Sequence, residues 1–196
     1  MVKELIQLVI LFFVIFDPPA SLIVFLVASS NMDKHERKVT ATLAVTVAAL
    51  LSYLVLLLGQ SLLTIFSTNI EEFRIAGGII LGILGIKMAL GLPLANLDEA
   101  KNSSGRAIAS IIGTPLLTGP AAITSIILAV NDYGRIKTGL SICIVLAISA
   151  VMLYKADMIH KILGKTSIQV SSTVLGLITL AWGVKLVSHG LLAIFS

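Results

Sequence analysis

The stretch Phe13-Val14-Ile15-Phe16-Asp17-Pro18-Pro19-Ala20-Ser21-Leu22 interrupts an apolar run over residues 5–28. At about 1.5 Å per residue, this run is long enough to cross a bilayer as a helix. Proline lacks an amide hydrogen and disfavours helical geometry in the residue before it, so Pro18 and Pro19 should break the helix at Asp17. Because proline is favoured in the first turn of a helix, the stretch predicts two half-helices, with Asp17 at the N-cap of the second.

The composition is typical of an integral membrane protein. Hydrophobic residues make up 57% of the 196 residues and charged residues only 12%, and the mean hydropathy is +1.06. The net charge of +4 is scattered, without a basic stripe or an aromatic platform, so no nucleic-acid partner is expected. A cleaved signal peptide is not expected, because the first apolar run is too long and contains the break. The composition therefore indicates the lipid bilayer as the surroundings of most of the chain.

The apolar periodicity predicts an all-α, polytopic membrane protein with six transmembrane helices. The expected spans cover residues of about 4–28, 38–66, 72–92, 106–130, 136–155 and 170–195, with the first and fourth broken at mid-membrane. The linker 93–105 separates a first three-helix repeat, residues 1–92, from a second, residues 106–196.

The fourth span repeats the anomaly of the first. It contains Gly113-Thr114-Pro115-Leu116-Leu117-Thr118-Gly119-Pro120-Ala121-Ala122-Ile123, with prolines, glycines and threonines at its centre. Pro120 can begin a second half-helix, capped by Thr118 or Gly119. This stretch therefore predicts a second break at the same depth as the first.

The two halves also match elsewhere. Segment 78–87 resembles segment 176–185, with glycines and a final lysine at the same spacing, and Asp17-Pro18 corresponds to Gly119-Pro120. Since each half has an odd number of spans, the second half should enter the membrane from the opposite side. An inverted repeat with a broken first helix in each half is typical of secondary transporters, whose site lies where the breaks meet.

The lysines and arginines predict the orientation. Of the 14, nine fall on one side of the expected spans and five on the other. Because the richer side faces the cytoplasm, the linker 93–105 should be cytoplasmic and both termini extracytoplasmic. The expected location is the cell (plasma) membrane, with several passes.

The residues of both breaks resemble the MarC family of integral membrane proteins, which includes small neutral amino acid transporters. The resemblance rests on Phe13 to Pro18 and on Pro115 to Ile123, and it extends over the whole chain. It implies a six-span carrier of the glycine and alanine class that works by alternating access and is driven by a proton or sodium gradient. The chain has Ala20 and Ala121 where the family pattern has glycine, and these methyl groups would narrow the pocket.

A small zwitterion needs hydrogen-bond donors for its carboxylate and acceptors for its ammonium. The half-helix N-termini offer free N–H groups and the half-helix C-termini offer freed carbonyls. Asp17 could contact the ammonium or the coupling ion, H+ or Na+; the alternative is that it only caps a helix. The candidate substrate-binding residues are Asp17, Pro18, Pro19, Ala20, Ser21, Gly113, Thr114, Pro115, Thr118, Gly119, Pro120, Ala121 and Ala122.

Other classes of function fit the sequence less well. An exporter or channel for a small ion or other small solute could use the same breaks, but a channel favours rings of charge that one intramembrane acid supplies only in a homo-oligomer. An enzyme is not expected, because a thiol oxidoreductase needs a cysteine pair and the chain has only Cys143. The three histidines, His35, His160 and His189, lie at span ends, so neither an intramembrane protease nor a metal site nor a cofactor is expected.

Overall fold

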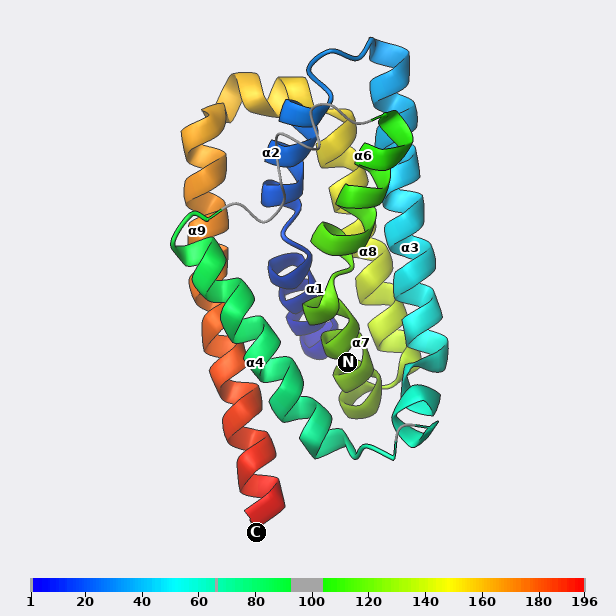
Figure 1. Ribbon diagram of the computed structural model, residues 1–196, viewed down its shortest axis with the longest axis vertical. Coiled ribbons are helices and arrows are strands. Elements are labelled where there is room, and N and C mark those ends of the chain that lie inside the picture. Colours follow the sequence, from blue (N-terminus) through cyan, green and yellow to red (C-terminus); the bar gives the residue numbers. More distant parts are fainter. Residues whose placement is uncertain (1, 66, 93–103, 196) are drawn as a thin grey trace.

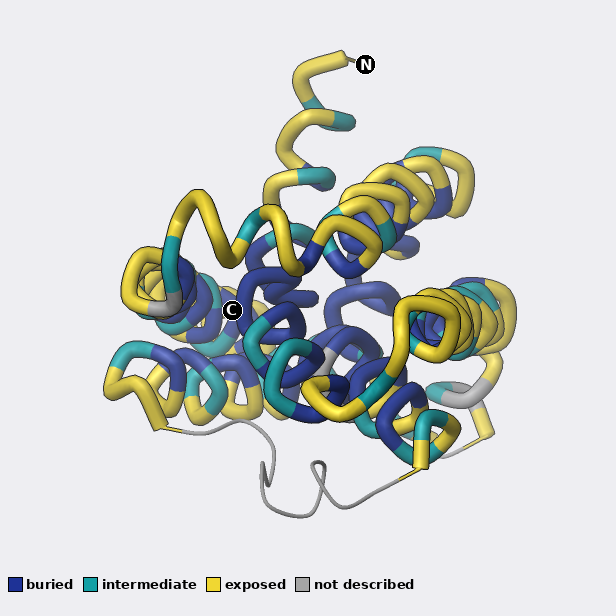
Figure 2. Tube along the Cα trace, turned by 90° about the horizontal axis from the view of Figure 1, so that it is seen from above, coloured by how far each residue is buried: buried dark blue, intermediate teal, exposed yellow. Residues whose placement is uncertain are grey.

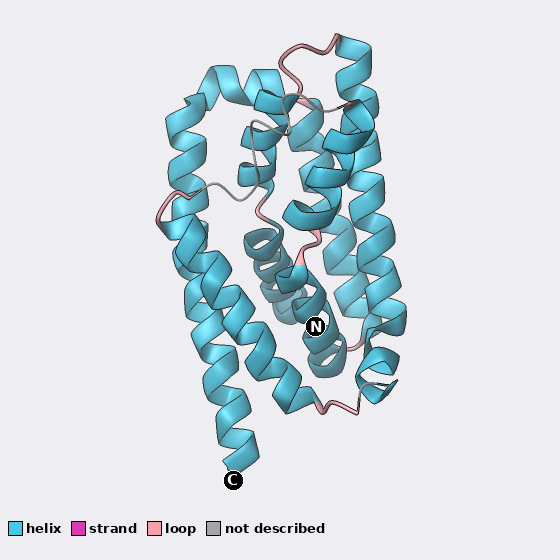
Figure 3. Cartoon of the chain, in the orientation of Figure 1, coloured by secondary structure: helices cyan, strands magenta, loops and turns pink. Residues whose placement is uncertain are grey.

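The computed structural model describes residues 2–65, 67–92 and 104–195, except for the side chains of residues 62, 64, 115, 116 and 165. All regular structure in these ranges is helical (Figure 3). The elements are α1 (Val2–Phe16), α2 (Pro18–Ala28), α3 (Lys34–Ile65), α4 (Ile70–Ala89), α6 (Gly105–Ile111), the π-helix η1 (Ile112–Leu117), α7 (Pro120–Tyr133), α8 (Arg135–Tyr154) and α9 (Ala156–Phe195). The expected all-α class is confirmed.

Several of these helices can cross a membrane. Within the described residues, 4 segments are long and apolar enough: Val2–Ala28, Lys34–Ser61, Arg135–Tyr154 and Thr166–Phe195. They coincide with the first, second, fifth and sixth expected spans. At the third and fourth positions lie α4 and the succession α6, η1 and α7, so the full number of six spans stays a prediction.

The broken helices form the centre of the bundle. In Figure 1, α1 and α2 follow one another upwards and α6, η1 and α7 follow one another downwards beside them. Helices α3 and α8 flank this centre on one side, and α4 and α9 flank it on the other. Figure 2 shows the central segments buried and the outer faces of the surrounding helices exposed.

The outer surface is apolar, as a lipid-facing surface must be. Large exposed hydrophobic side chains include Leu50 and Leu57 on α3 and Leu177 and Val184 on α9. Exposed apolar area of this extent would be costly in water, whereas lipid tails cover it without penalty. The fold is therefore that of a multi-pass membrane protein.

Small residues let α4 and α9 approach closely. A methyl group at Gly183 would lie 2.7 Å from the Gly78 carbonyl oxygen, and one at Gly85 would lie 2.5 Å from the backbone nitrogen of Leu180. Glycines at such spacing allow backbone-to-backbone packing of membrane helices. Gly78, Gly85 and Gly183 therefore lie where α4 and α9 pack most closely.

A kink divides α9 into two segments. Gly164 has φ 73° and ψ 162°, a conformation that glycine adopts at little cost. The segment before it runs along the upper end of the bundle in Figure 1, and the longer segment after it descends beside α4. The kink thereby brings the second segment of α9 next to the first break.

Candidate functional site

The first break lies where the prolines predict it. Helix α1 ends at Phe16, α2 begins at Pro18, and Asp17 between them has φ 41° and ψ 65°. The Asp17 Oδ1 atom accepts a hydrogen bond from the Ala20 N–H at 3.2 Å, so Asp17 is the N-cap of α2, as expected. A non-glycine residue in this left-handed region is strained by about 1–3 kcal/mol and persists only where its surroundings hold it.

A helix from the other half of the chain helps to hold Asp17. The Ser172 hydroxyl on α9 donates a hydrogen bond to Asp17 Oδ2 at 2.6 Å. Asp17 is 3% exposed and Ser172 is 8% exposed, so both groups are withdrawn from the outer surface. Each carboxylate oxygen therefore has a donor, which lowers the cost of burying the group.

The second break has a different local structure. The chain leaves α6 through the π-helical turn η1, passes through Thr118 and Gly119, and enters α7 at Pro120. The Thr118 hydroxyl donates to the carbonyl of Gly113, five residues earlier, and does not cap α7. Gly119 is the N-cap residue, and no side chain among the described residues caps this end. Within that part of the chain, the start of α7 keeps unpaired N–H groups and the positive end of the helix dipole.

The two breaks meet at one cavity. It has a volume of about 120 Å³, and since a single water needs about 10–15 Å³ on this measure, it can admit a small solute. Its lining consists of Ile15, Asp17, Ile80, Leu84, Lys87, Met88, Gly119, Pro120, Ala121 and Ala122. Five predicted site residues from two distant stretches of sequence thus face a common space.

The other candidates whose side chains the structure describes lie outside the lining of this cavity. Pro18, Pro19, Ala20 and Ser21 are buried in the first turn of α2, and the Ser21 hydroxyl has no hydrogen-bond partner in the part of the chain that the structure describes. In the second stretch, Gly113 and Thr118 are buried and Thr114 is exposed. The side chain of Pro115 lies outside the described set.

Sequence reasoning missed two groups at this site. Ser172 is one of several hydroxyls on an apolar helix, and its pairing with Asp17 joins residues 155 positions apart. Lys87, in the last turn of α4, lines the same cavity as Asp17 and carries the opposite charge. The signal for Lys87 was present, because the repeat aligns it with Lys185.

Comparison with known proteins agrees with this structure. The family model described as "MarC family integral membrane protein" matches residues 2–195. A UPF0056 membrane protein of Buchnera aphidicola subsp. Schizaphis graminum is 30% identical over 184 residues, which cover 91% of this chain and 87% of that protein. Relatives with the same description from Methanocaldococcus jannaschii (28% identical; 91% of this chain and 91% of the relative) and Escherichia coli (YhcE; 27% identical; 93% and 89%) also match.

No solved structure matches the chain. The match of the family model over residues 2–195 confirms the resemblance seen at the two breaks. The chain therefore belongs to the MarC family of integral membrane proteins.

Proposed function

We propose that this protein is a secondary transporter of small neutral amino acids, of the glycine and alanine class, coupled to a proton or sodium gradient. The observation that carries the proposal is the cavity at which the breaks of α1–α2 and η1–α7 meet. Paired discontinuous helices with a site between them are the binding architecture of many secondary transporters. The family resemblance at the same residues supplies the substrate class.

The contacts between helices support two inverted three-helix repeats. If the halves are exchanged, the contact of α1 with α8 becomes that of α6 with α3, and the contact of α2 with α9 becomes that of α7 with α4. The contacts α3–α8 and α4–α9 each map onto themselves. Such reciprocity is expected for a pseudo-two-fold axis in the membrane plane. Alternating access would then be a rocking of the two repeats about the cavity.

The cavity offers complementary groups to a zwitterion. Asp17 can accept hydrogen bonds from a substrate ammonium in addition to those from Ala20 and Ser172, because a carboxylate has about four acceptor positions. The uncapped start of α7 and the Lys87 ammonium can receive the substrate carboxylate.

The size of the lining residues favours a small substrate. Ala121 and Ala122 contribute only methyl groups, and both are buried against the second break. This argues for glycine and alanine as substrates.

Uptake by purified protein in liposomes tests the proposal. Labelled glycine should accumulate above its external concentration when an inward proton or sodium gradient is imposed, and collapse of that gradient should release it. Unlabelled alanine should compete and phenylalanine should not. No accumulation under either gradient by well-folded protein would contradict the proposal, and a glycine-independent ion current would favour the channel alternative.

A further inference from the structure

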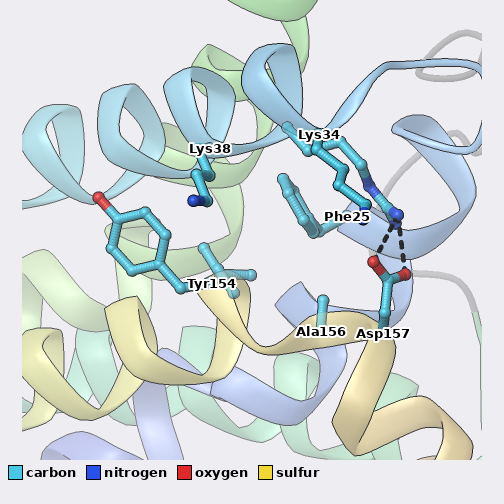
Figure 4. A pocket seen from close by; sticks show the side chains of 8 residues that line it. Phe25, Lys34, Lys38, Tyr154, Ala156 and Asp157 are labelled. Atoms are coloured by element: carbon cyan, nitrogen blue, oxygen red, sulfur yellow. Dashed lines mark hydrogen bonds and ion pairs between the residues drawn. The ribbon is translucent and has the colours of Figure 1, made fainter.

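A second hollow lies at the end of the bundle where α2 and α8 end and α3 and α9 begin. It has a volume of about 160 Å³ and is separate from the cavity at the breaks. Its lining consists of Phe25, Lys34, Arg37, Lys38, Leu153, Tyr154, Ala156 and Asp157. Figure 4 shows the labelled side chains gathered from opposing helices around this space, which we call the basic pocket.

Arg37 forms a fixed wall of the basic pocket. Its Nη1 atom donates to both carboxylate oxygens of Asp157, at 2.7 and 2.8 Å, and its Nε atom donates to the Ser29 hydroxyl at 3.0 Å. The guanidinium also lies 5.9 Å from the ring centroid of Phe25. Arg37 therefore has its partners within the protein, and Asp157 balances its charge.

Lys34 and Lys38 lack such partners. Neither ammonium has an ion pair or a hydrogen bond within the described ranges, although both line the basic pocket. The neighbouring acids are engaged at the start of α3. Asp33 accepts from the N–H groups of His35 and Glu36, at 2.7 and 2.8 Å, and Glu36 accepts from the Asp33 N–H at 3.1 Å. The lining thus carries three cations and one carboxylate. Two of these cations, the ammonium groups of Lys34 and Lys38, are available to bind an anion.

Tyr154 fixes the wall opposite α3. Its hydroxyl lies 2.7 Å from the Thr42 hydroxyl, which itself donates to the Lys38 carbonyl at 2.8 Å. Because Thr42 has one hydroxyl hydrogen, Tyr154 must be the donor in this pair. Its ring therefore shapes the pocket, while the lysines supply the donors for a ligand.

The depth of the basic pocket corresponds to the headgroup level. Helix α2 spans 11 residues from the break at Asp17 to the pocket end, which is about 16 Å at 1.5 Å per residue. Half of the hydrocarbon core of a bilayer is about 15 Å. With the break at mid-membrane, the pocket lies at the boundary of hydrocarbon and headgroups, where tyrosine and lysine are favoured.

We propose that the basic pocket binds the phosphate group of an anionic phospholipid, with Lys34 and Lys38 as its ligands. Val151, one turn before Tyr154 on α8, is 55% exposed and offers apolar surface for the acyl chains directly below the pocket. The bound lipid would connect the start of α3 with the end of α8, and so the two halves of the chain. The site is independent of the transport proposal, because it shares no residue with the cavity at the breaks.

Lipid titration of the detergent-purified full chain tests this site. Short-chain phosphatidylglycerol, phosphatidylcholine with the same chains, and inorganic phosphate are added, and the bound lipid is counted by native mass spectrometry together with the shift in thermal midpoint. A lysine near an anionic lipid raises the binding affinity about fivefold, so the two lysines should make phosphatidylglycerol bind about 25-fold more tightly than phosphatidylcholine. The preference should weaken as potassium chloride is raised.

Matched variants distinguish lipid binding in the basic pocket from non-specific attraction by the positive charge at this end of the bundle. Lys34→Gln with Lys38→Gln should abolish the preference for phosphatidylglycerol. Arg106→Gln with Lys161→Gln removes the same charge from exposed positions outside the pocket and should keep the preference. Equal losses in both double variants, or an unchanged preference in the first, would overturn the proposal. An equal thermal shift from millimolar inorganic phosphate would identify a soluble anion as the ligand and overturn the lipid assignment.

A measurement on the unmodified chain keeps the proposal testable if the first double variant does not fold. Photoactivatable phosphatidylglycerol, reactive in its headgroup region, should crosslink to peptides at the start of α3 or the end of α8. An excess of ordinary phosphatidylglycerol should suppress these crosslinks, while phosphatidylcholine should not. Crosslinks found only elsewhere on the chain would contradict the site.

Discussion

Ser172 of α9 donates a 2.6 Å hydrogen bond to the carboxylate of Asp17, so a helix of the second half holds the break in the first half. Asp17 is in a left-handed conformation, and its other oxygen caps α2 through Ala20. One side chain therefore couples the geometry of the break to the position of α9. A displacement of α9 from α2 would break the bond to Ser172 and free an acceptor in the cavity.

Replacement of Ser172 by alanine should weaken the first break. A buried carboxylate oxygen that loses its donor costs roughly 1–3 kcal/mol, so the thermal midpoint of the purified protein should fall. Ser171→Ala is the matched control, since Ser171 is exposed and its hydroxyl donates to the Ser167 carbonyl of its own helix. Equal midpoints for both variants would show that the Asp17–Ser172 bond does not stabilise the fold.

Two glycine-to-alanine substitutions test the close approach of α4 and α9. A methyl at Gly183 would lie 2.7 Å from both the Gly78 carbonyl oxygen and the Gly82 nitrogen, whereas the nearest atom to a methyl at Gly82 is 4.0 Å away. Gly183→Ala should therefore destabilise the fold by about 1–3 kcal/mol through overpacking. Gly82→Ala should be neutral or slightly stabilising, because alanine is the better helix former. The order of the two thermal midpoints decides the outcome, and a reversed order would contradict the packing.

The breaks could be predicted because their causes are local. Pro18 and Pro19 remove backbone donors within one turn, and the N-cap position of Asp17 follows from the same few residues. The convergence of the breaks was also predictable, because the repeat in the sequence implies it. Five residues of the two stretches do line one cavity.

The parts that could not be predicted depend on packing. The bond from Ser172 to Asp17 depends on the descent of α9 after Gly164, which no short-range pattern indicates. The π-helical turn η1 and the bond from Thr118 to the Gly113 carbonyl result from how the chain satisfies carbonyls freed by proline, for which several solutions exist. Lys87 was visible only as a repeated residue, and its place on the cavity follows from the packing of α4.

The orientation in the membrane is a separate prediction. The bias of lysine and arginine places both termini outside the cytoplasm and the linker inside. Single cysteines are introduced at positions 2 and 195 in a variant with Cys143 replaced, and a thiol reagent is added from each side of the membrane. Both cysteines should be modified only from outside. Lys101→Cys, which lies beyond the described residues, should react only from inside. A cytoplasmic N-terminus would contradict the orientation, and termini on opposite sides of the membrane would contradict the inverted repeat.

The width of the cavity gives a prediction about substrate size. Ala122 is 2% exposed and lines the cavity, so Ala122→Val should reduce its volume without exposing a polar group. Alanine transport should then fall more than glycine transport, because the larger substrate loses the space first. The measurement is the ratio of the initial uptake rates of alanine and glycine. Ala147→Val on the exposed face of α8 is the control and should leave this ratio unchanged. An equal loss for both substrates in Ala122→Val would place Ala122 outside the contacts that determine substrate size.

Asp17→Asn separates the structural role of the first break from its proposed role in transport. Asparagine has nearly the same shape, its side-chain oxygen can accept from the Ala20 N–H, and its amide nitrogen can donate to the Ser172 hydroxyl, which then acts as acceptor. The loss of helix capping should therefore be near 1 kcal/mol or less. The variant should therefore fold, while the negative charge available to an ammonium or a coupling ion is gone. We expect gradient-driven accumulation of glycine to disappear.

The control for this prediction is another capping aspartate. Asp33 caps α3 through the N–H groups of His35 and Glu36 at an exposed helix end, and Asp33→Asn should keep full accumulation. Binding, followed by the thermal shift with glycine, then identifies the role of Asp17. Retained binding without accumulation would assign Asp17 to the coupling ion, because only the use of the gradient is lost. Loss of both would assign it to the substrate ammonium, whereas full accumulation by folded Asp17→Asn protein would leave the half-helix ends and Lys87 as the whole site.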